Sequence, residues 1–132
     1  MRLVFDTNVL IAALISHGVC NELLEHCVLN HEVILSEFIL AELKDKLTGK
    51  FKFSVREANP AVRLLKSRCK IVPTAPIASP ICRDPDDDNI IATAMAGQCA
   101  CIITGDKDLL ELDAVGGIQV LPPGSFWQFE QI

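Results

Sequence analysis

Short apolar runs that alternate with stretches of helical periodicity limit the fold of this chain more than any other feature. Five runs have the length and composition of buried strands, at residues 2–5, 31–35, 70–72, 99–104 and 118–121. Between them, apolar residues recur every three or four positions, as on one face of a helix. Strands that alternate with helices are typical of a parallel sheet covered by helices. We therefore predict one domain over residues 1–132, of class α/β, with a three-layer α/β/α architecture around a mainly parallel sheet.

Local capping signals mark where several helices begin. Ser36 follows the second strand and is a favourable N-cap residue. Ser54 and Glu57 have the spacing of a capping box, whereas Pro60 predicts a late start or a kink in the same helix. The Asp-Pro pair at 84–85 combines an N-cap with a proline at the first helical position, which is a favoured helix start.

Composition and hydropathy narrow the class of protein. Half of the residues are hydrophobic, 22% are charged and the mean hydropathy is +0.34, which excludes a disordered acidic chain. No uninterrupted apolar run reaches the roughly 18 residues that a membrane span requires. Residues 1–16 are the nearest match to a signal peptide, but Asp6 and Asn8 interrupt their apolar part. We therefore expect a cytoplasmic protein that does not bind membranes.

The six cysteines suggest neither a disulfide framework nor a zinc site. Cys99 and Cys101 are too close together for the usual zinc-binding pair, and no second close pair or matched histidine pair accompanies them. Most cysteines lie in apolar segments, where a free thiol behaves as a small hydrophobic side chain. We expect free, mostly buried thiols.

The net charge of −5 argues against tight, passive binding to duplex DNA, because phosphate-binding surfaces are basic. A nucleic-acid enzyme can carry such a charge when many of its acids surround a divalent cation, because the cation reverses the local field. The distribution of the acids therefore matters more than their number.

Acidic residues fall where a parallel sheet would bring them to one edge. Asp6 directly follows the first strand, and Asp106 comes shortly after the strand at 99–104. An acidic cluster at 84–88 begins the helix that leads into that strand, and Glu42 lies in the helix after the second strand. Sheets of this kind bind ligands beyond the carboxyl ends of their strands. These acids are therefore expected to meet at one site.

Carboxylates that share a site repel one another unless a cation lies between them. Oxygen ligands suit Mg²⁺ or Mn²⁺, and such ions can bind a phosphodiester, activate a water and stabilise the leaving oxygen. The sequence contains no nucleophile elbow, P-loop or dinucleotide-binding motif that would indicate a competing chemistry. The pattern therefore favours metal-dependent phosphodiester hydrolysis.

Several of these acids also have structural explanations. Asp6 could cap the following helix, although burial at a strand end is costly for a carboxylate without a ligand. Glu42 alone would most often be a solvated residue on a helix face. Asp84 is explained by its N-cap position, and Asp106 and Asp108 fit turn positions.

The choice of ligand within the 84–88 cluster stays open. All of its acids gain from the positive end of the helix dipole. Asp87 lies four and seven residues before Ile91 and Ala94, so it shares their inward face. Asp88 lies three residues before Ile91 and is a close rival. We prefer Asp87, with Asp84 and Asp88 as alternatives.

Four segments resemble the PIN-domain family and occur in the order typical of it: FDTNVLIAAL (5–14), LSEFILAEL (35–43), CRDPDDDNIIATAMA (82–96) and IITGDKDLLEL (102–112). The chain is most similar to the VapC-like branch, which contains the toxins of toxin–antitoxin pairs. This resemblance spans nearly the whole chain. It implies a Mg²⁺- or Mn²⁺-dependent ribonuclease, with single-stranded or loop RNA as its substrate.

The resemblance also implies roles for individual residues. The residues that match the family's catalytic, metal-binding acids are Asp6, Glu42, Asp87 and Asp106, with Asp84, Asp88 and Asp108 as further candidates. Those that match polar positions near these acids, where they would orient them, are Asn8, Ser36 and Thr104. Arg83 and Lys107 flank the acids and are candidate contacts to the RNA backbone. Glu42 is expected either to bind the ion or to orient the attacking water.

A cognate antitoxin protein is the partner that the resemblance implies, and a homodimer is a second candidate assembly. Four apolar residues on helical faces could bury a partner peptide or a second copy: Leu23, Leu24, Cys27 and Val28. One alternative to the ribonuclease is a PIN-fold module that binds RNA or an antitoxin with little or no cleavage. Another is a receiver-type phosphotransfer domain, which we disfavour because the first strand ends in Asp-Thr-Asn rather than in an acidic pair.

Overall fold

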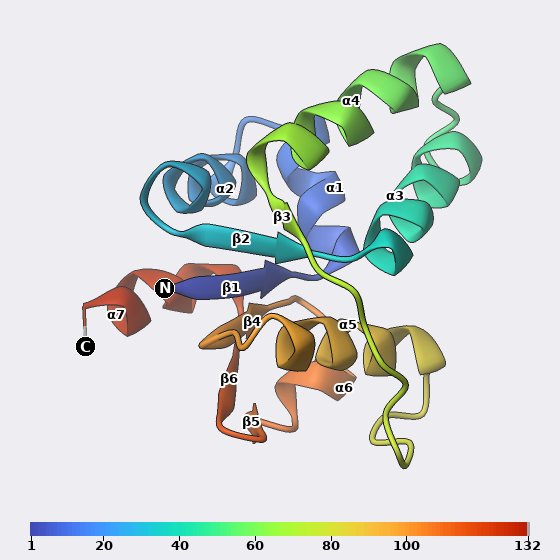
Figure 1. Ribbon diagram of the computed structural model, residues 1–132. Helices are drawn as coiled ribbons and strands as arrows, with labels where there is room; N and C mark the ends of the chain where they lie inside the picture. The colour runs from blue at the N-terminus through green and yellow to red at the C-terminus, as the bar shows by residue number, and fades with distance from the viewer. Residues whose placement is uncertain (132) are drawn as a thin grey trace.

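The computed structural model describes residues 1–131 and contains a six-stranded sheet of order β3-β2-β1-β4-β6-β5 (Figure 1). The strands are β1 (Arg2–Phe5), β2 (Glu32–Leu35), β3 (Lys70–Ile71), β4 (Cys101–Ile103), β5 (Ala114–Val115) and β6 (Ile118–Leu121). All neighbouring strands are parallel except β5 and β6. The predicted α/β class with a mainly parallel sheet is therefore confirmed.

Helices connect the strands and cover the sheet. They are α1 (Thr7–Ile15), α2 (Val19–Asn30), α3 (Glu37–Gly49), α4 (Val55–Arg68), α5 (Pro85–Ala96), α6 (Lys107–Leu110) and α7 (Phe126–Glu130), with a 3₁₀ turn, η1 (Pro123–Ser125). Figure 1 shows α1 to α4 together on one side of β1 and β2, with α5 on the other side. Apolar side chains from both helical layers meet the sheet in one core.

The central strands β1 and β4 are fully enclosed. Leu3, Val4 and Phe5 of β1 are 0% exposed, and all three residues of β4 are buried. Strands with both faces covered are continuous apolar runs without alternation, which is why these two segments were recognisable in the sequence. Because β1 and β4 are parallel neighbours, the residues that follow them lie side by side at the carboxyl edge of the sheet.

The capping predictions are confirmed, and of the two alternatives predicted from Pro60 the late start does not occur. Ser36 Oγ accepts a hydrogen bond from the Ile39 amide, and Ser54 and Glu57 form both bonds of a capping box. The helix α4 begins at Val55, so the late start predicted from Pro60 does not occur. The capping box fixes the start of α4 before the chain reaches the proline, and the missing amide bond falls at an exposed position.

A two-stranded hairpin near the C-terminus was not predicted. Strand β5 pairs with β6 in antiparallel register, through a turn at Gly116 and Gly117. Both glycines have positive φ, 56° and 82°, as the tightest hairpin turns require. A strand of only two residues has no room for an alternating pattern, so the sequence does not reveal it.

The end of α5 packs tightly against β2 at Gly97. A Cβ atom at this position would lie 2.6 Å from Cγ2 of Ile34, a fully buried side chain of β2. We expect Gly97→Ala to lower the free energy of unfolding by about 1–3 kcal/mol, the usual cost of overpacking a core. Gly49→Ala, where no atom lies within 4 Å of the added carbon, should cost little. Urea unfolding measures both, and equal stability of the two variants would contradict this packing.

All six cysteines are free, but only three of them, Cys27, Cys99 and Cys101, are buried, so burial is less general than predicted. Burial raises the pKa of Cys27, Cys99 and Cys101 to about 12, so these thiols are poor nucleophiles and poor metal ligands. Within residues 1–131, no single helix is long and apolar enough to cross a membrane; α1 and α2 pass that test only as a pair bent by 105°.

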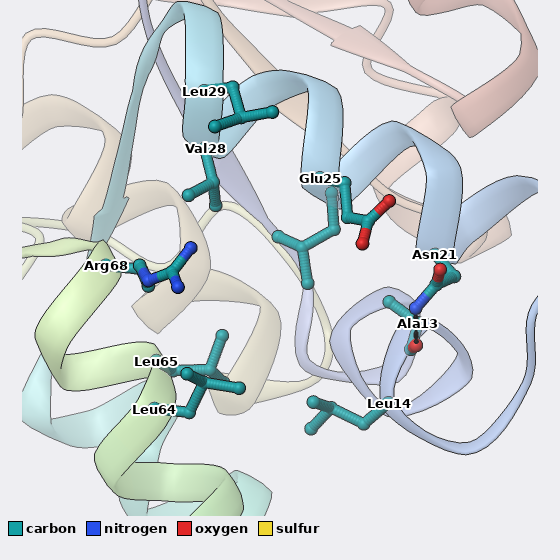
Figure 2. Close-up of a pocket in the computed structure, with 10 residues that line it drawn as sticks. Ala13, Leu14, Asn21, Glu25, Val28, Leu29, Leu64, Leu65 and Arg68 are labelled. Atoms are coloured by element: carbon teal, nitrogen blue, oxygen red, sulfur yellow. Dashed lines mark hydrogen bonds between the residues drawn. The ribbon is translucent and has the colours of Figure 1, made fainter.

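The apolar face predicted to remain free on α2 is mostly part of the core. Leu23 and Cys27 are 0% exposed, so the prediction of a partner surface was wrong for these two residues. Only Val28 of that set is half-buried, and with Leu24 it lines an apolar groove between α1, α2 and α4 (Figure 2). The buried residues belong to the core because α2 packs against β2 and α1.

Candidate active site

Carboxylates from four distant segments line one small cavity at the carboxyl edge of the sheet. Its volume is about 60 Å³, and its lining residues are Asp6, Asn8, Glu42, Lys46, Asp84, Asp86, Asp87, Ile90 and Asp106. Asp6 follows β1, Glu42 belongs to α3, the acids at 84–87 begin α5, and Asp106 follows β4. The structure thus brings together all four acids that were predicted to form the site.

Asp6 lies at the centre of this cluster and is only 6% exposed. It occupies the N-cap position of α1, but its side chain makes no capping hydrogen bond. Its Oδ2 atom instead accepts a 2.7 Å hydrogen bond from the Thr104 hydroxyl. Burial raises the pKa of Asp6 and the neighbouring Asp106 reinforces this, while the Thr104 bond opposes it. The capping explanation for Asp6 therefore fails, and its carboxylate faces the cavity.

Thr104 connects the two strand-end acids. It is fully buried, donates to Asp6, and accepts a 3.0 Å hydrogen bond from the Asp106 amide. One hydroxyl thus fixes both the Asp6 side chain and the backbone that carries Asp106. This contact gives Thr104 the geometry expected of a residue that orients the acids.

Replacement of Thr104 by valine tests this orienting contact. We expect Thr104→Val to weaken Mn²⁺ binding by roughly 10–100-fold, the usual cost of losing a residue that positions a metal ligand. Thr104→Ser keeps the hydroxyl and should retain most of the affinity. Metal titration of both variants measures the effect. Similar affinities for the valine and serine variants would show that the hydroxyl has no orienting role.

The structure separates the three rivals at the start of α5. Asp84 Oδ1 accepts from the Asp86 amide at 2.9 Å, which is an N-cap contact. Asp88 turns away from the cavity and accepts from the backbone amides of residues 81 and 82. Asp87 is 6% exposed, lines the cavity and makes none of these contacts. Burial, helped by Asp106 and Asp84, raises the pKa of Asp87 to about 7.

Asp106 and Asp108 lie beside Asp87. One carboxylate oxygen from each of the three lies within 4.8 Å of the other two. Asp106 also caps the short helix α6, because its Oδ1 accepts from the Asp108 amide at 2.8 Å. Asp108 accepts a 3.0 Å hydrogen bond from Arg83, whose side chain is 88% exposed. Arg83 is therefore paired with an acid of the cluster, while Lys107 stays exposed.

Glu42 reaches the cavity from α3, with partners that the sequence did not indicate. Its Oε1 atom accepts a hydrogen bond from the Thr7 hydroxyl. Burial raises the pKa of Glu42, the Thr7 bond opposes this effect, and the carboxylate of Asp86 adds to it. Asp86 lines the same cavity. Thr7, the residue that follows Asp6, thus holds Glu42 in the site.

Asn8 and Ser36 have contacts different from those predicted. Asn8 accepts a 3.2 Å hydrogen bond from Lys46 Nζ and touches none of the acids by a hydrogen bond within residues 1–131. Ser36 is buried and bonds to the Thr93 hydroxyl at 2.8 Å, which links the start of α3 to α5. Ser36 therefore supports the helices that carry Glu42 and Asp87 rather than the acids themselves.

Lys46 is the residue of the site that sequence reasoning missed most clearly. Its ammonium group lowers the pKa of both Asp6 and Glu42, and it is the one basic residue among those that line the cavity. The available signal was its position four residues after Glu42 on the same helix, because residues at this spacing share a face. Thr7 and Asp86 had a weaker signal, as sequence neighbours of predicted acids.

The cluster has the chemistry of a site for a hard divalent cation. It offers carboxylate oxygens, which Mg²⁺ and Mn²⁺ prefer. Burial is the main cause of the raised pKa values of Asp6, Glu42 and Asp87, and neighbouring carboxylates add to it. A positive ion between these acids would stabilise their charged forms. The residues present therefore fit such an ion.

Comparison with known proteins places this arrangement in a family context. The model of the PIN domain family matches residues 2–108. The uncharacterized protein MJ1680 of Methanocaldococcus jannaschii is 34% identical over 121 residues, which cover 85% of this chain and 75% of that protein.

Solved structures share the fold. VapBC-1 from nontypeable Haemophilus influenzae superposes with a TM-score of 0.65 at 19% identity, over 94% of this chain and 99% of the other. The PIN domain endonuclease Utp24 superposes with a TM-score of 0.54 at 22% identity, over 90% and 82%. The three-layer arrangement around a mainly parallel sheet is thus common to all three.

Proposed function

Since the chain belongs to the PIN domain family, we propose that it is a metal-dependent endoribonuclease that cuts at the acidic cavity. The observation that supports this proposal is the convergence of Asp6, Glu42, Asp87 and Asp106 on one cavity at the carboxyl edge of the sheet. These acids come from four elements, so their meeting is a property of the fold and not of one local motif. The match to the PIN domain family argues against the receiver-type phosphotransfer alternative.

In this proposal, Asp6, Asp87 and Asp106 hold Mg²⁺ or Mn²⁺, and Asp108 lies close enough to contribute. The ion would supply stabilisation of negative charge on the phosphoryl group and a lowered pKa for a water. Glu42, held by Thr7, either completes the ligand set or orients the attacking water. Lys46 supplies a positive charge beside Asp6 and Glu42 and is placed to bind a phosphate oxygen of the substrate.

We propose that the substrate is single-stranded or loop RNA. We also propose that the protein acts in the cytoplasm. The acidic cavity is small and lies at the sheet edge, and a splayed strand can present its backbone there more easily than a duplex. The chain has one Trp, six Phe and no Tyr, so base stacking contributes little to binding. Recognition would therefore depend mainly on the backbone.

Cleavage of end-labelled nucleic acids tests the proposal. We expect Mn²⁺ or Mg²⁺ to support cutting of single-stranded RNA, EDTA to abolish it, and duplex DNA to stay intact. Loss of cutting in Asp6→Asn, prepared in the same way, would separate this activity from a contaminating nuclease. Inactivity with each metal on linear, hairpin and structured RNA, together with retained RNA binding, would instead favour a binding module without catalysis.

We further propose that an antitoxin protein is the partner of this chain. The groove of Figure 2, with a volume of about 380 Å³, is lined mainly by apolar side chains of α1, α2 and α4, with Glu25 and Arg68 at its margin. Leu29 and Leu64 are 77% and 52% exposed there. An amphipathic peptide helix would cover these leucines.

Surface variants test this partner site. Leu64→Arg should weaken binding of the protein encoded by a short neighbouring reading frame by roughly 10-fold or more, since apolar contacts at the centre of an interface dominate affinity. Val55→Arg is the matched control, because Val55 is 57% exposed on the same helix but outside the groove. Equal binding by the two variants would place the partner elsewhere.

A further inference from the structure

Two of the three histidines of the chain converge with a glutamate away from the acidic cavity. His26 belongs to α2, His31 directly precedes β2, and Glu130 ends α7. The Nε2 atoms of both histidines lie 2.5 Å from Oε2 of Glu130. This group lies at the amino end of β2, whereas the acidic cavity lies at the carboxyl ends of the strands. Figure 1 shows α7 beside the N-terminus and the start of β1.

We propose that His26, His31 and Glu130 form a binding site for a divalent transition-metal ion, for which Zn²⁺ is the best match. One donor atom from each residue lies within 4.8 Å of the other two. Donors bound to a tetrahedral Zn²⁺ at 2.0–2.1 Å are roughly 3.3 Å apart, so side-chain movements of about 1 Å admit the ion. Two imidazoles and one carboxylate are a known zinc ligand set, with a water at the fourth position.

Neighbouring residues hold the two rings in place. The other ring nitrogen, Nδ1, contacts Asn30 Nδ2 at 3.3 Å in His26 and the Met1 amino group at 3.0 Å in His31. The indole of Trp127 packs on His26 with ring centroids 4.8 Å apart. Both Nε2 atoms consequently point to Glu130. Both partners are N–H donors, so Nδ1 accepts and Nε2 carries the ring proton in the metal-free chain. An ion at Nε2 must therefore displace this proton, and the two Nδ1 contacts must rearrange.

This site and the acidic cavity differ in the ions that they select. Imidazole nitrogen suits Zn²⁺, Ni²⁺ and Cu²⁺, whereas Mg²⁺ prefers sites made of oxygen ligands. The side chains of His26, His31 and Glu130 are 29%, 13% and 24% exposed, so an ion can enter from solvent. Binding would join α7 to α2 and β2. A helix of five residues is unstable alone, so such a link would fix the C-terminal segment.

Titration of Zn²⁺ into the full chain tests the site. The protein is first stripped with chelator, and Mg²⁺ is kept in large excess to occupy the acidic cavity. We expect one Zn²⁺ per chain, with a dissociation constant of about 1 μM or tighter. Trp127 is the one tryptophan of the chain and lies against His26, so quenching of its fluorescence by Ni²⁺ or Cu²⁺ gives a second readout at this location.

Three variants distinguish a metal site from a pair of hydrogen bonds. Glu130→Gln keeps an oxygen that can accept from both histidines but removes the charged ligand, so the fold should persist while Zn²⁺ binds more than roughly 100-fold more weakly, beyond the usual effect of an outer-shell change. His31→Gln should have the same effect. His17→Gln, at an exposed histidine outside the group, should bind as the wild type does. Zn²⁺ binding that is absent in the wild type, or unchanged in Glu130→Gln, would overturn the proposal.

Discussion

Asp6→Asn should lower the rate of RNA cleavage by more than roughly 10²-fold while leaving the protein folded. The asparagine oxygen can still accept the hydrogen bond from Thr104. Burial raises the pKa of the Asp6 carboxyl group, so the neutral asparagine suits this buried position and the fold should persist. What the substitution removes is an anionic ligand at the centre of the cluster, and losses at such a position exceed those for an outer-shell partner. Single-turnover cleavage of labelled RNA with Mn²⁺ measures the effect.

A matched control exists for this variant. Asp113 is exposed, lies outside the cavity and has a φ of 61°. Asparagine tolerates this left-handed conformation about as well as aspartate, so Asp113→Asn removes the same charge without structural cost. It should cleave at the wild-type rate. If Asp6→Asn also kept that rate, the acidic cavity would not be the active site.

Asp87→Asn should stabilise the metal-free protein at pH 8 while it abolishes cleavage. The pKa of Asp87 is about 7 in the folded chain, against a usual value of 3.8, so between these values the folded state binds more protons than the unfolded state. The contribution of Asp87 to stability is therefore complete below about pH 4 and is lost as the pH rises through 7. Asparagine carries no charge and avoids that loss.

Thermal unfolding in EDTA measures this effect. We expect Asp87→Asn to melt roughly 3–6 °C above the wild type at pH 8, the shift that about 1 kcal/mol produces in a domain of this size, with a smaller difference at pH 5. Addition of Mn²⁺ should raise the melting temperature of the wild type and have little effect on the variant. A variant less stable than the wild type at pH 8 in EDTA would refute the raised pKa of Asp87.

The parts of the site that follow strand ends could be predicted, because topology alone determines where they lie. Asp6 and Asp106 follow the two buried central strands, and parallel neighbours end at one edge of a sheet. The preference for Asp87 over Asp88 rested on helical spacing alone, which left Asp88 a close rival. In the structure, the backbone amides of residues 81 and 82 donate hydrogen bonds to the Asp88 carboxylate and hold it away from the cavity. The conformation of this loop cannot be predicted from hydrophobic periodicity.

Contacts between polar residues that are far apart in the sequence could not be predicted either. The bonds from Thr7 to Glu42 and from Ser36 to Thr93 depend on the packing of α3 against α1 and α5, which residue patterns do not specify. The same holds for Glu130, which lies about a hundred positions from its histidines in the chain. Cysteine and histidine spacing is a useful guide to metal sites only when the ligands are close in sequence.

The strand order has a consequence for the protein during its own translation. The neighbour of β1 on one side is β4, which the ribosome synthesises late, and Asp106 follows it. A nascent chain that lacks β4 has β1 as an unpaired edge and only part of the acidic cluster. The proposed ribonuclease could therefore not cut RNA before β4 and Asp106 have been synthesised, since the acidic cluster is incomplete until then.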